Sequence, residues 1–173
     1  MTLSYKLNNH HLVLILILAA ALIRWLPHPD NFTPIGALAL FAGAYIDRRV
    51  FWLVPLVALF LGDLINGLYD LLVMGFVYLG LFASTWLGRQ IIYGRDSVTR
   101  IMMGVGAGSI SFWLISNFGA FLAFRPISID GLVSCYIDAI PYFTRSLTGD
   151  ALYAVVLFGG YFLLRSTLKL KTT

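Results

Sequence analysis

Long runs of apolar residues, separated by short polar joints, constrain the fold of this sequence more than any other feature. Of its 173 residues, 60% are hydrophobic and 12% are charged, which is more apolar surface than a soluble domain of this size needs. The apolar segments are therefore predicted to lie in a lipid bilayer, where backbone groups must form hydrogen bonds within their own segment. Each run is accordingly predicted to be a helix, and the spans expected are residues 12–26, 34–46, 51–68, 71–87, 101–124 and 149–164.

The runs predict an all-α, polytopic membrane bundle of about six transmembrane helices, with residues 1–173 in a single membrane-embedded domain. The second run is short, because residues 34–46 at about 1.5 Å each cover only about 20 Å of a hydrocarbon core of about 30 Å. It is either a full span or a re-entrant, tucked helix, and the sequence leaves both open. The first run also resembles a secretory signal with alanines at 19–21, but it stays apolar beyond them to Leu26.

Basic residues predict the orientation of the bundle. In a six-span arrangement, nine of the twelve Lys and Arg residues share one side with the N-terminus, and the positive-inside rule makes that side the cytoplasm. A five-span arrangement, with a re-entrant second run and an external N-terminus, also places nine inside. Both predict a multi-pass inner (plasma) membrane protein with a cytoplasmic C-terminus and an external connection over residues 125–148. The net charge of +4 is thus a topology signal, and no nucleic acid is expected as a partner.

Polar residues in the outer halves of the spans are candidates for a binding site. Asp63 is predicted about 18 Å along its helix, where a carboxylate is costly unless it is paired or faces a cavity. It is interpreted either as a ligand contact or as half of a structural ion pair with Arg24, and both readings can hold together. Asn66 and Asp70 follow at i+3 and i+7, which places them on the face of Asp63. Asn117 in the fifth run is either a ligand contact or a hydrogen-bonding link between helices.

The outer connection over residues 125–148 is the longest joint in the sequence. Long ordered connections are commonly lids or binding loops, so Tyr136, Asp138 and Arg145 in this segment are predicted to contact a ligand. Its apolar residues give it a part-helical, amphipathic character, which predicts that it lies on the bundle as a lid. The alternative is an interfacial helix that only seals the bundle. Asp150, at the expected start of the last span, is interpreted as complementing the dipole of that helix.

Motifs for catalysis or metal binding are missing from the sequence. It contains no Walker loop, no GxSxG and no HExxH, and neither His28 nor Cys135 has neighbours at the spacing of a metal site. Cys135 is the single cysteine, which excludes an intramolecular disulfide, and it has no paired base in the sequence. We therefore expect a protein that is not an enzyme, with no catalytic residue, no metal and no cofactor.

Several segments resemble an uncharacterised family of small bacterial integral-membrane proteins. The resemblance is carried by NFTPIGALALFAGA at 31–44, LVPL at 53–56 with Gly62-Asp63, SNFG at 116–119, CYIDAIPYF at 135–143 and LTGD at 147–150. It extends over roughly residues 31–161. Membership of such a family implies an integral membrane protein and no particular activity.

A short second span rich in Gly and Ala, a basic inner turn and a third span that ends in Gly-Asp are similar to the S components of energy-coupling-factor vitamin importers. This resemblance implies a six-helix fold that binds a micronutrient near the outer face and docks on a membrane coupling subunit. The Gly and Ala residues that crowd 36–44 and 104–108 predict close helix contacts, either inside the bundle or at such a docking surface.

The function expected from these observations is capture or uptake of a small micronutrient or vitamin-like molecule. The protein would be a substrate-binding or solitary transport component with a pocket at the outer face. A scaffold or assembly subunit, whose buried polar residues only pair with one another, is the alternative. A membrane enzyme is a weaker third reading, because it would need a catalytic pair. The partners expected are the lipid bilayer, the small molecule, and a coupling subunit or a second copy of the chain.

Overall fold

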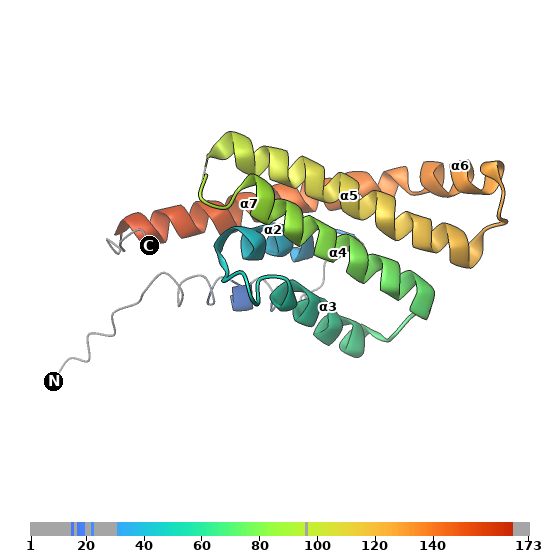
Figure 1. Cartoon of the computed structure of the whole chain (residues 1–173), viewed down its shortest axis with the longest axis horizontal. Helices are drawn as coiled ribbons and strands as arrows, with labels where there is room; N and C mark the ends of the chain where they lie inside the picture. Colours follow the sequence, from blue (N-terminus) through green and yellow to red (C-terminus); the bar gives the residue numbers. More distant parts are fainter. Residues whose placement is uncertain (1–14, 16, 20–21, 23–30, 96, 168–173) are drawn as a thin grey trace.

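The described residues form α-helices joined by turns and loops, with no strand among them (Figure 1). A computed structural model of the chain describes residues 15, 17–19, 22, 31–95 and 97–167. The predicted all-α class is confirmed, whereas most of the first apolar run lies outside the described residues and the number of spans stays a prediction. The helices, labelled as in Figure 1, are α2 (Ile35–Tyr45), α3 (Leu53–Asn66), α4 (Leu71–Ile91), α5 (Val98–Phe124), α6 (Ile129–Asp138) and α7 (Ile140–Thr167).

Within the described residues, three helices are long and apolar enough to cross a membrane: α4 with 21 residues, α5 with 27 and α7 with 28. They carry large apolar side chains on the outside, among them Leu71, Val98 and Val155, whose exposed fractions are 78%, 73% and 72%. A surface of this kind is unfavourable in water and favourable in the hydrocarbon of a bilayer. These features indicate a membrane protein.

Helix α2 is the centre of the bundle and contacts α3, α4, α5 and α7. Every residue from Ala37 to Ala44 is buried. With 11 residues α2 covers only about 16 Å, which is short for a full span and favours the tucked alternative. A Cβ on Gly88 of α4 would lie 2.6 Å from the carbonyl oxygen of Leu40, and one on Gly43 would overlap the carbonyl of Thr85. The small residues of α2 therefore serve close packing inside the bundle.

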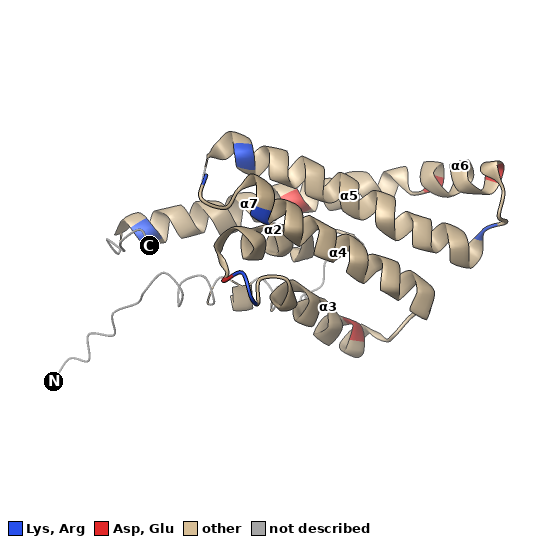
Figure 2. Cartoon of the chain, in the orientation of Figure 1, with Lys and Arg blue, Asp and Glu red and all other residues tan. Residues whose placement is uncertain are grey.

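The two ends of the bundle differ in charge, with basic residues gathered mainly at one end in Figure 2. At this end Arg89 donates from Nη1 to the carbonyl oxygen of Ile46 at 2.9 Å and lies over the rings of Phe51 and Tyr93. The grouping agrees with the predicted joints, while the side of the membrane that it faces stays a prediction. The arginines where α2, α4 and α7 end and α3 and α5 begin are Arg48, Arg49, Arg89, Arg95, Arg100 and Arg165.

The connection after α5 is part-helical, as predicted, but it is shorter than predicted. It contains the short helix α6, whose N-cap Ser128 accepts a hydrogen bond from the N–H of Gly131 at 3.0 Å, and α7 then begins at Ile140. The last span is therefore longer than residues 149–164, because residues 140–148 belong to the same helix. The hydroxyls of the two threonines in this stretch find partners within α7: Thr144 Oγ1 donates to the carbonyl oxygen of Pro141 at 2.8 Å, and Thr148 Oγ1 donates to that of Thr144 at 2.7 Å. Polar residues lowered the hydropathy of this stretch without breaking its helix.

Helix α3 ends earlier than the predicted third span. It stops at Asn66, and Gly67 follows with a φ of 99°, a conformation that favours glycine. Asp70 then caps α4, since its Oδ1 accepts a hydrogen bond from the N–H of Val73 at 3.0 Å. The prediction that Asp70 shares a helical face with Asp63 and Asn66 is therefore wrong, because the chain turns between α3 and α4.

Candidate ligand-binding cavity

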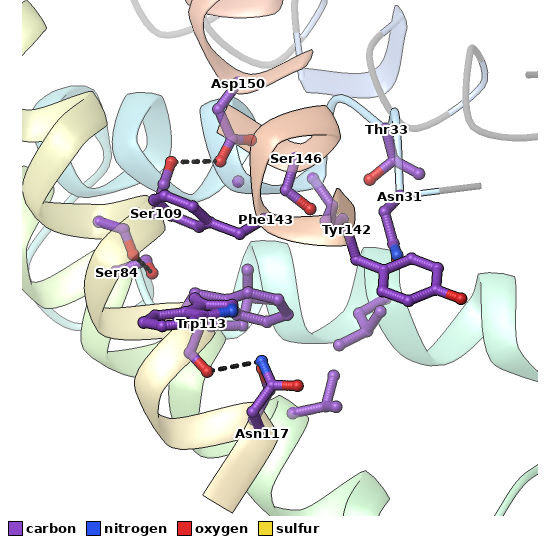
Figure 3. A pocket seen from close by; sticks show the side chains of 18 of the residues that line it. Asn31, Thr33, Ser84, Ser109, Trp113, Asn117, Tyr142, Phe143, Ser146 and Asp150 are labelled. Carbon is purple, nitrogen blue, oxygen red and sulfur yellow. Dashed lines mark hydrogen bonds between the residues drawn. The ribbon is translucent and has the colours of Figure 1, made fainter. Parts of the chain in front are cut away.

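A cavity of about 490 Å³ lies between α2, α3, α4, α5 and α7, in the half of the bundle away from the six grouped arginines. Along α5 it extends from Gly108 to Ala120, and along α7 from Tyr142 to Asp150. Its walls combine apolar and aromatic side chains with a few carboxylate, hydroxyl and amide groups (Figure 3). Deep pockets of this composition are typical binding sites for small molecules.

The end of the cavity nearest the six grouped arginines, called its inner end below, is built around Asp150. This residue is only 8% exposed. Its Oδ2 accepts a hydrogen bond from Ser109 Oγ at 2.7 Å, drawn in Figure 3. The carboxylate also accepts a hydrogen bond from the backbone N–H of Ala37 in α2. The first N–H groups of a helix lack partners within it and attract negative charge. Asp150 therefore caps α2 from a neighbouring helix.

This position of Asp150 corrects the sequence-based interpretation. Asp150 was expected to complement the dipole of its own helix, but α7 begins at Ile140 and Asp150 lies in its interior. The dipole that it complements is that of α2. The contact is close enough that a Cβ on Gly36 would overlap the carboxylate, so a larger residue at this position of α2 would displace the Asp150 side chain.

Asp63 lines the cavity from α3 and is 4% exposed. The hydroxyl of Tyr78 in α4 donates to its Oδ2 at 2.9 Å. A buried carboxylate in a spanning segment is expected to be paired or to face a cavity, and Asp63 has a hydrogen-bond partner and a place on the cavity wall. Arg24 lies outside the described residues, so the ion pair between Arg24 and Asp63 stays a prediction.

One face of α5 supplies a continuous wall of the cavity. Ser109, Trp113, Asn117 and Ala120 line it at spacings of four, four and three residues, which stack side chains on one face of a helix. Asn117 Nδ2 donates to the carbonyl oxygen of Trp113 at 2.8 Å, one turn earlier in α5. In Figure 3, Trp113 lies between the Ser109–Asp150 pair and Asn117. Trp113 thus occupies the middle of this wall.

The indole of Trp113 has an unsatisfied donor. Its Nε1 is buried and has no hydrogen-bond partner within the described part of the chain. The ring is held by Tyr136, with ring centroids 5.1 Å apart, and by Phe143, at 5.2 Å. Sequence reasoning missed Trp113. One signal in the sequence could have identified it. Tryptophans of membrane proteins prefer the interfaces between membrane and water, whereas Trp113 lies in the middle of an apolar run.

The predicted site residues fall into two groups. Asp63 and Asn117 line the cavity, and the predicted outer connection contributes Tyr142, Phe143 and Ser146 through the first turns of α7. The others do not line it. Asn66 is exposed at the end of α3, Asp138 pairs with Arg125 at 2.7 Å, Arg145 is exposed on α7, and Tyr136 reaches the site only by contacting Trp113.

Helix α6 lies on the bundle as expected, but it lines no part of the cavity. The hydroxyl of Tyr136 donates to the carbonyl oxygen of Leu114 at 2.6 Å, and Cys135 Sγ contacts the carbonyl oxygen of Asn117 at 3.6 Å. Burial, followed by the nearby thiol of Cys135, raises the pKa of the Tyr136 hydroxyl above its usual value. Through these contacts α6 holds the side chain of Trp113 in place.

Metal ligation finds no support in the described residues, where no group of three or more His, Cys, Asp or Glu side chains comes together. His28 lies outside them. Cys135 is buried, with its sulfur against the backbone of α5. The side chains that line the cavity offer hydrogen bonds and aromatic contacts.

Comparison with known proteins adds the family of the chain. Residues 5–171 match a family of unknown function, DUF6580. The chain belongs to this family. The predicted membership of an uncharacterised family is thereby confirmed for nearly the whole length of this DUF6580 chain. No curated protein and no solved structure matches it, so the resemblance to vitamin-importer S components stays a prediction.

Proposed function

We propose that this DUF6580 protein captures a small organic molecule, such as a micronutrient, for uptake across the membrane. It would act as a substrate-binding component or as a solitary transporter. The observation that carries the proposal is the cavity of about 490 Å³ with the unsatisfied Trp113 donor in its wall. By the positive-inside rule, the end with six arginines faces the cytoplasm, and the cavity then lies towards the outer face.

The alternative is a scaffold, in which buried polar groups only pair with one another. Two pairs fit that reading, since Ser109 donates to Asp150 and Tyr78 donates to Asp63. Trp113 does not fit that reading. A buried donor without a hydrogen bond, such as Trp113 Nε1, lowers the stability of the fold by about 1–3 kcal/mol, and a scaffold gains nothing from it. A cavity of this size is likewise a cost in a subunit that only has to pack. Both features favour a binding protein.

The test is to identify what the protein carries. The full chain is purified in lipid nanodiscs, denatured, and the released small molecules are identified by mass spectrometry against empty nanodiscs. We expect one compound at a constant ratio to protein. Ala120→Phe places a large side chain in the cavity and should remove the compound. Ile110→Phe introduces the same aromatic residue on the exposed side of α5, where Ile110 is 49% exposed, and should keep the compound.

A folded protein that carries no compound, or a compound retained equally by Ala120→Phe and Ile110→Phe, would contradict the proposal. Size-exclusion chromatography of both variants shows whether each has kept its fold, so that loss of the compound is not mistaken for unfolding.

A further inference from the structure

The cavity wall carries information about the chemistry of its ligand. We propose that Trp113 is its specificity-determining residue, and that the ligand is a planar heteroaromatic molecule whose carbonyl oxygen or ring nitrogen accepts a hydrogen bond from Trp113 Nε1. This inference rests on the proposed binding function and names the class of molecule that the same cavity takes.

The Trp113 donor is the first step of the argument. Nε1 is buried and unpartnered in the part of the chain that the structure describes, although polar side chains lie one turn away on either side. Ser109 Oγ donates to Asp150, and Asn117 Nδ2 donates to the backbone of Trp113. Buried donors are nearly always satisfied in native proteins, and an exception needs an explanation. Trp113 lines the cavity, and a ligand that packs against its ring and displaces the side chain covering Nε1 supplies the acceptor.

The fixed orientation of the indole is the second step. Its ring meets the ring of Tyr136 at an interplanar angle of 82° and that of Phe143 at 42°. Tyr136 is itself held by the hydrogen bond from its hydroxyl to the carbonyl oxygen of Leu114. If the Trp113 side chain rotated to bring Nε1 to another acceptor, it would lose its contacts with Tyr136 and Phe143. Preorganised donors of this kind select between ligands, because a ligand that lacks the acceptor leaves the hydrogen bond of the donor unmade.

The shape of the expected ligand follows from the other lining residues. Phe112, Tyr142 and Phe143 line the cavity together with Trp113, and aromatic rings favour stacked or edge-to-face contacts with a second ring system. Asn117 offers a complementary group, because its Oδ1 makes no hydrogen bond within the described residues and can accept one from the ligand. A planar ring with polar atoms on its edge satisfies the walls and the donor together.

The experiment uses two probes of nearly the same shape. Quinoline carries a ring nitrogen acceptor, whereas naphthalene lacks it, and both are titrated into the full chain in nanodiscs freed of any co-purified compound. Binding is followed by the indole N–H signals of ¹⁵N-tryptophan-labelled protein in nuclear magnetic resonance spectra. Trp113→Phe identifies the signal of Trp113 and removes the donor. Trp86→Phe is the matched control, because Trp86 lies on α4 and lines no part of the cavity.

Quinoline should bind about tenfold more tightly than naphthalene to the wild type, a ratio typical of one hydrogen bond, and should move the Trp113 N–H signal downfield. The preference should vanish in Trp113→Phe and persist in Trp86→Phe. Comparing the ratio between variants cancels the different partition of the probes into lipid. Equal binding of the two probes to the wild type, or a preference that survives Trp113→Phe, would overturn the inference.

The two proposals can fail separately. If mass spectrometry finds a native compound without a planar ring or acceptor, the binding function stands and the assignment of Trp113 falls. If the wild type carries no compound and neither probe moves the Trp113 signal, both proposals fall.

Discussion

Replacement of Gly36 tests how the inner end of the cavity is held together. A Cβ at this position would lie 2.6 Å from Cγ of Asp150, well inside van der Waals contact. The backbones of both residues are held in helices, Gly36 in the first turn of α2 and Asp150 in the interior of α7, so the Asp150 side chain is the part that has to move. Gly36→Ala should therefore displace the carboxylate from Ser109 Oγ and from the N–H of Ala37.

The size of the effect follows from these two hydrogen bonds. Bonds to a buried carboxylate contribute about 1.5–3 kcal/mol each, so their loss costs about 3–6 kcal/mol. Replacing a helical glycine by alanine raises the free energy of unfolding by about 1 kcal/mol. The free energy of unfolding should fall by about 2–5 kcal/mol. Gly75→Ala makes the same chemical change in α4 with nothing within 4 Å of the new Cβ, and it should raise that free energy by up to about 1 kcal/mol.

The assay is reversible unfolding in mild detergent or bicelles, with a double-mutant cycle between Gly36→Ala and Asp150→Ala. Once the carboxylate is gone, the added methyl group has no carboxylate to displace, so the double variant should be no less stable than Asp150→Ala alone. The reasoning is refuted if Gly36→Ala behaves like Gly75→Ala. It is equally refuted if the losses of the two single variants simply add.

Two further predictions concern the orientation of the bundle and the partner of Asp63. Reporter fusions at the C-terminus and in the joint over residues 92–97 should both read cytoplasmic, because arginines gather at that end, and an external signal at either would reverse the orientation. Arg24→Ala and Asp63→Ala should each lower the free energy of unfolding by about 3–5 kcal/mol if the two residues form a buried ion pair, while the double variant recovers part of the loss. Strict additivity in unfolding experiments would show that Asp63 relies on partners other than Arg24.

Helix positions were the part of the fold that sequence reasoning predicted well. The second run was expected at 34–46 and α2 spans Ile35–Tyr45, because apolar composition and short polar joints are local signals. The start of α7 was missed for a local reason too. Thr144 and Thr148 lower the hydropathy of the segment, yet their hydroxyls bond to carbonyl groups of α7 itself. Hydropathy measures solubility in lipid, and it does not measure the ability to form a helix.

The site was predicted only in part, because its key contacts join residues far apart in the sequence. Asp63 and Asn117 could be identified from their cost in a spanning helix. The pair formed by Ser109 and Asp150 joins residues separated by 41 positions, and no local pattern indicates it. Trp113 required knowledge of which neighbours fix its ring and leave its donor unsatisfied. Such information exists only once α5, α6 and α7 have been placed side by side.

The short length of α2 explains why a cavity and a buried carboxylate occur together. A helix that begins inside the hydrocarbon region exposes backbone N–H groups there, which is tolerated only where protein groups or a cavity satisfy them. α2 begins at Ile35 beside the cavity, and Asp150 satisfies the N–H of Ala37. Ile35 and Gly36, the first residues of α2, line the cavity. A ligand reaching the inner end of the cavity would therefore meet the groups that hold α2, which couples its binding to the position of the central helix.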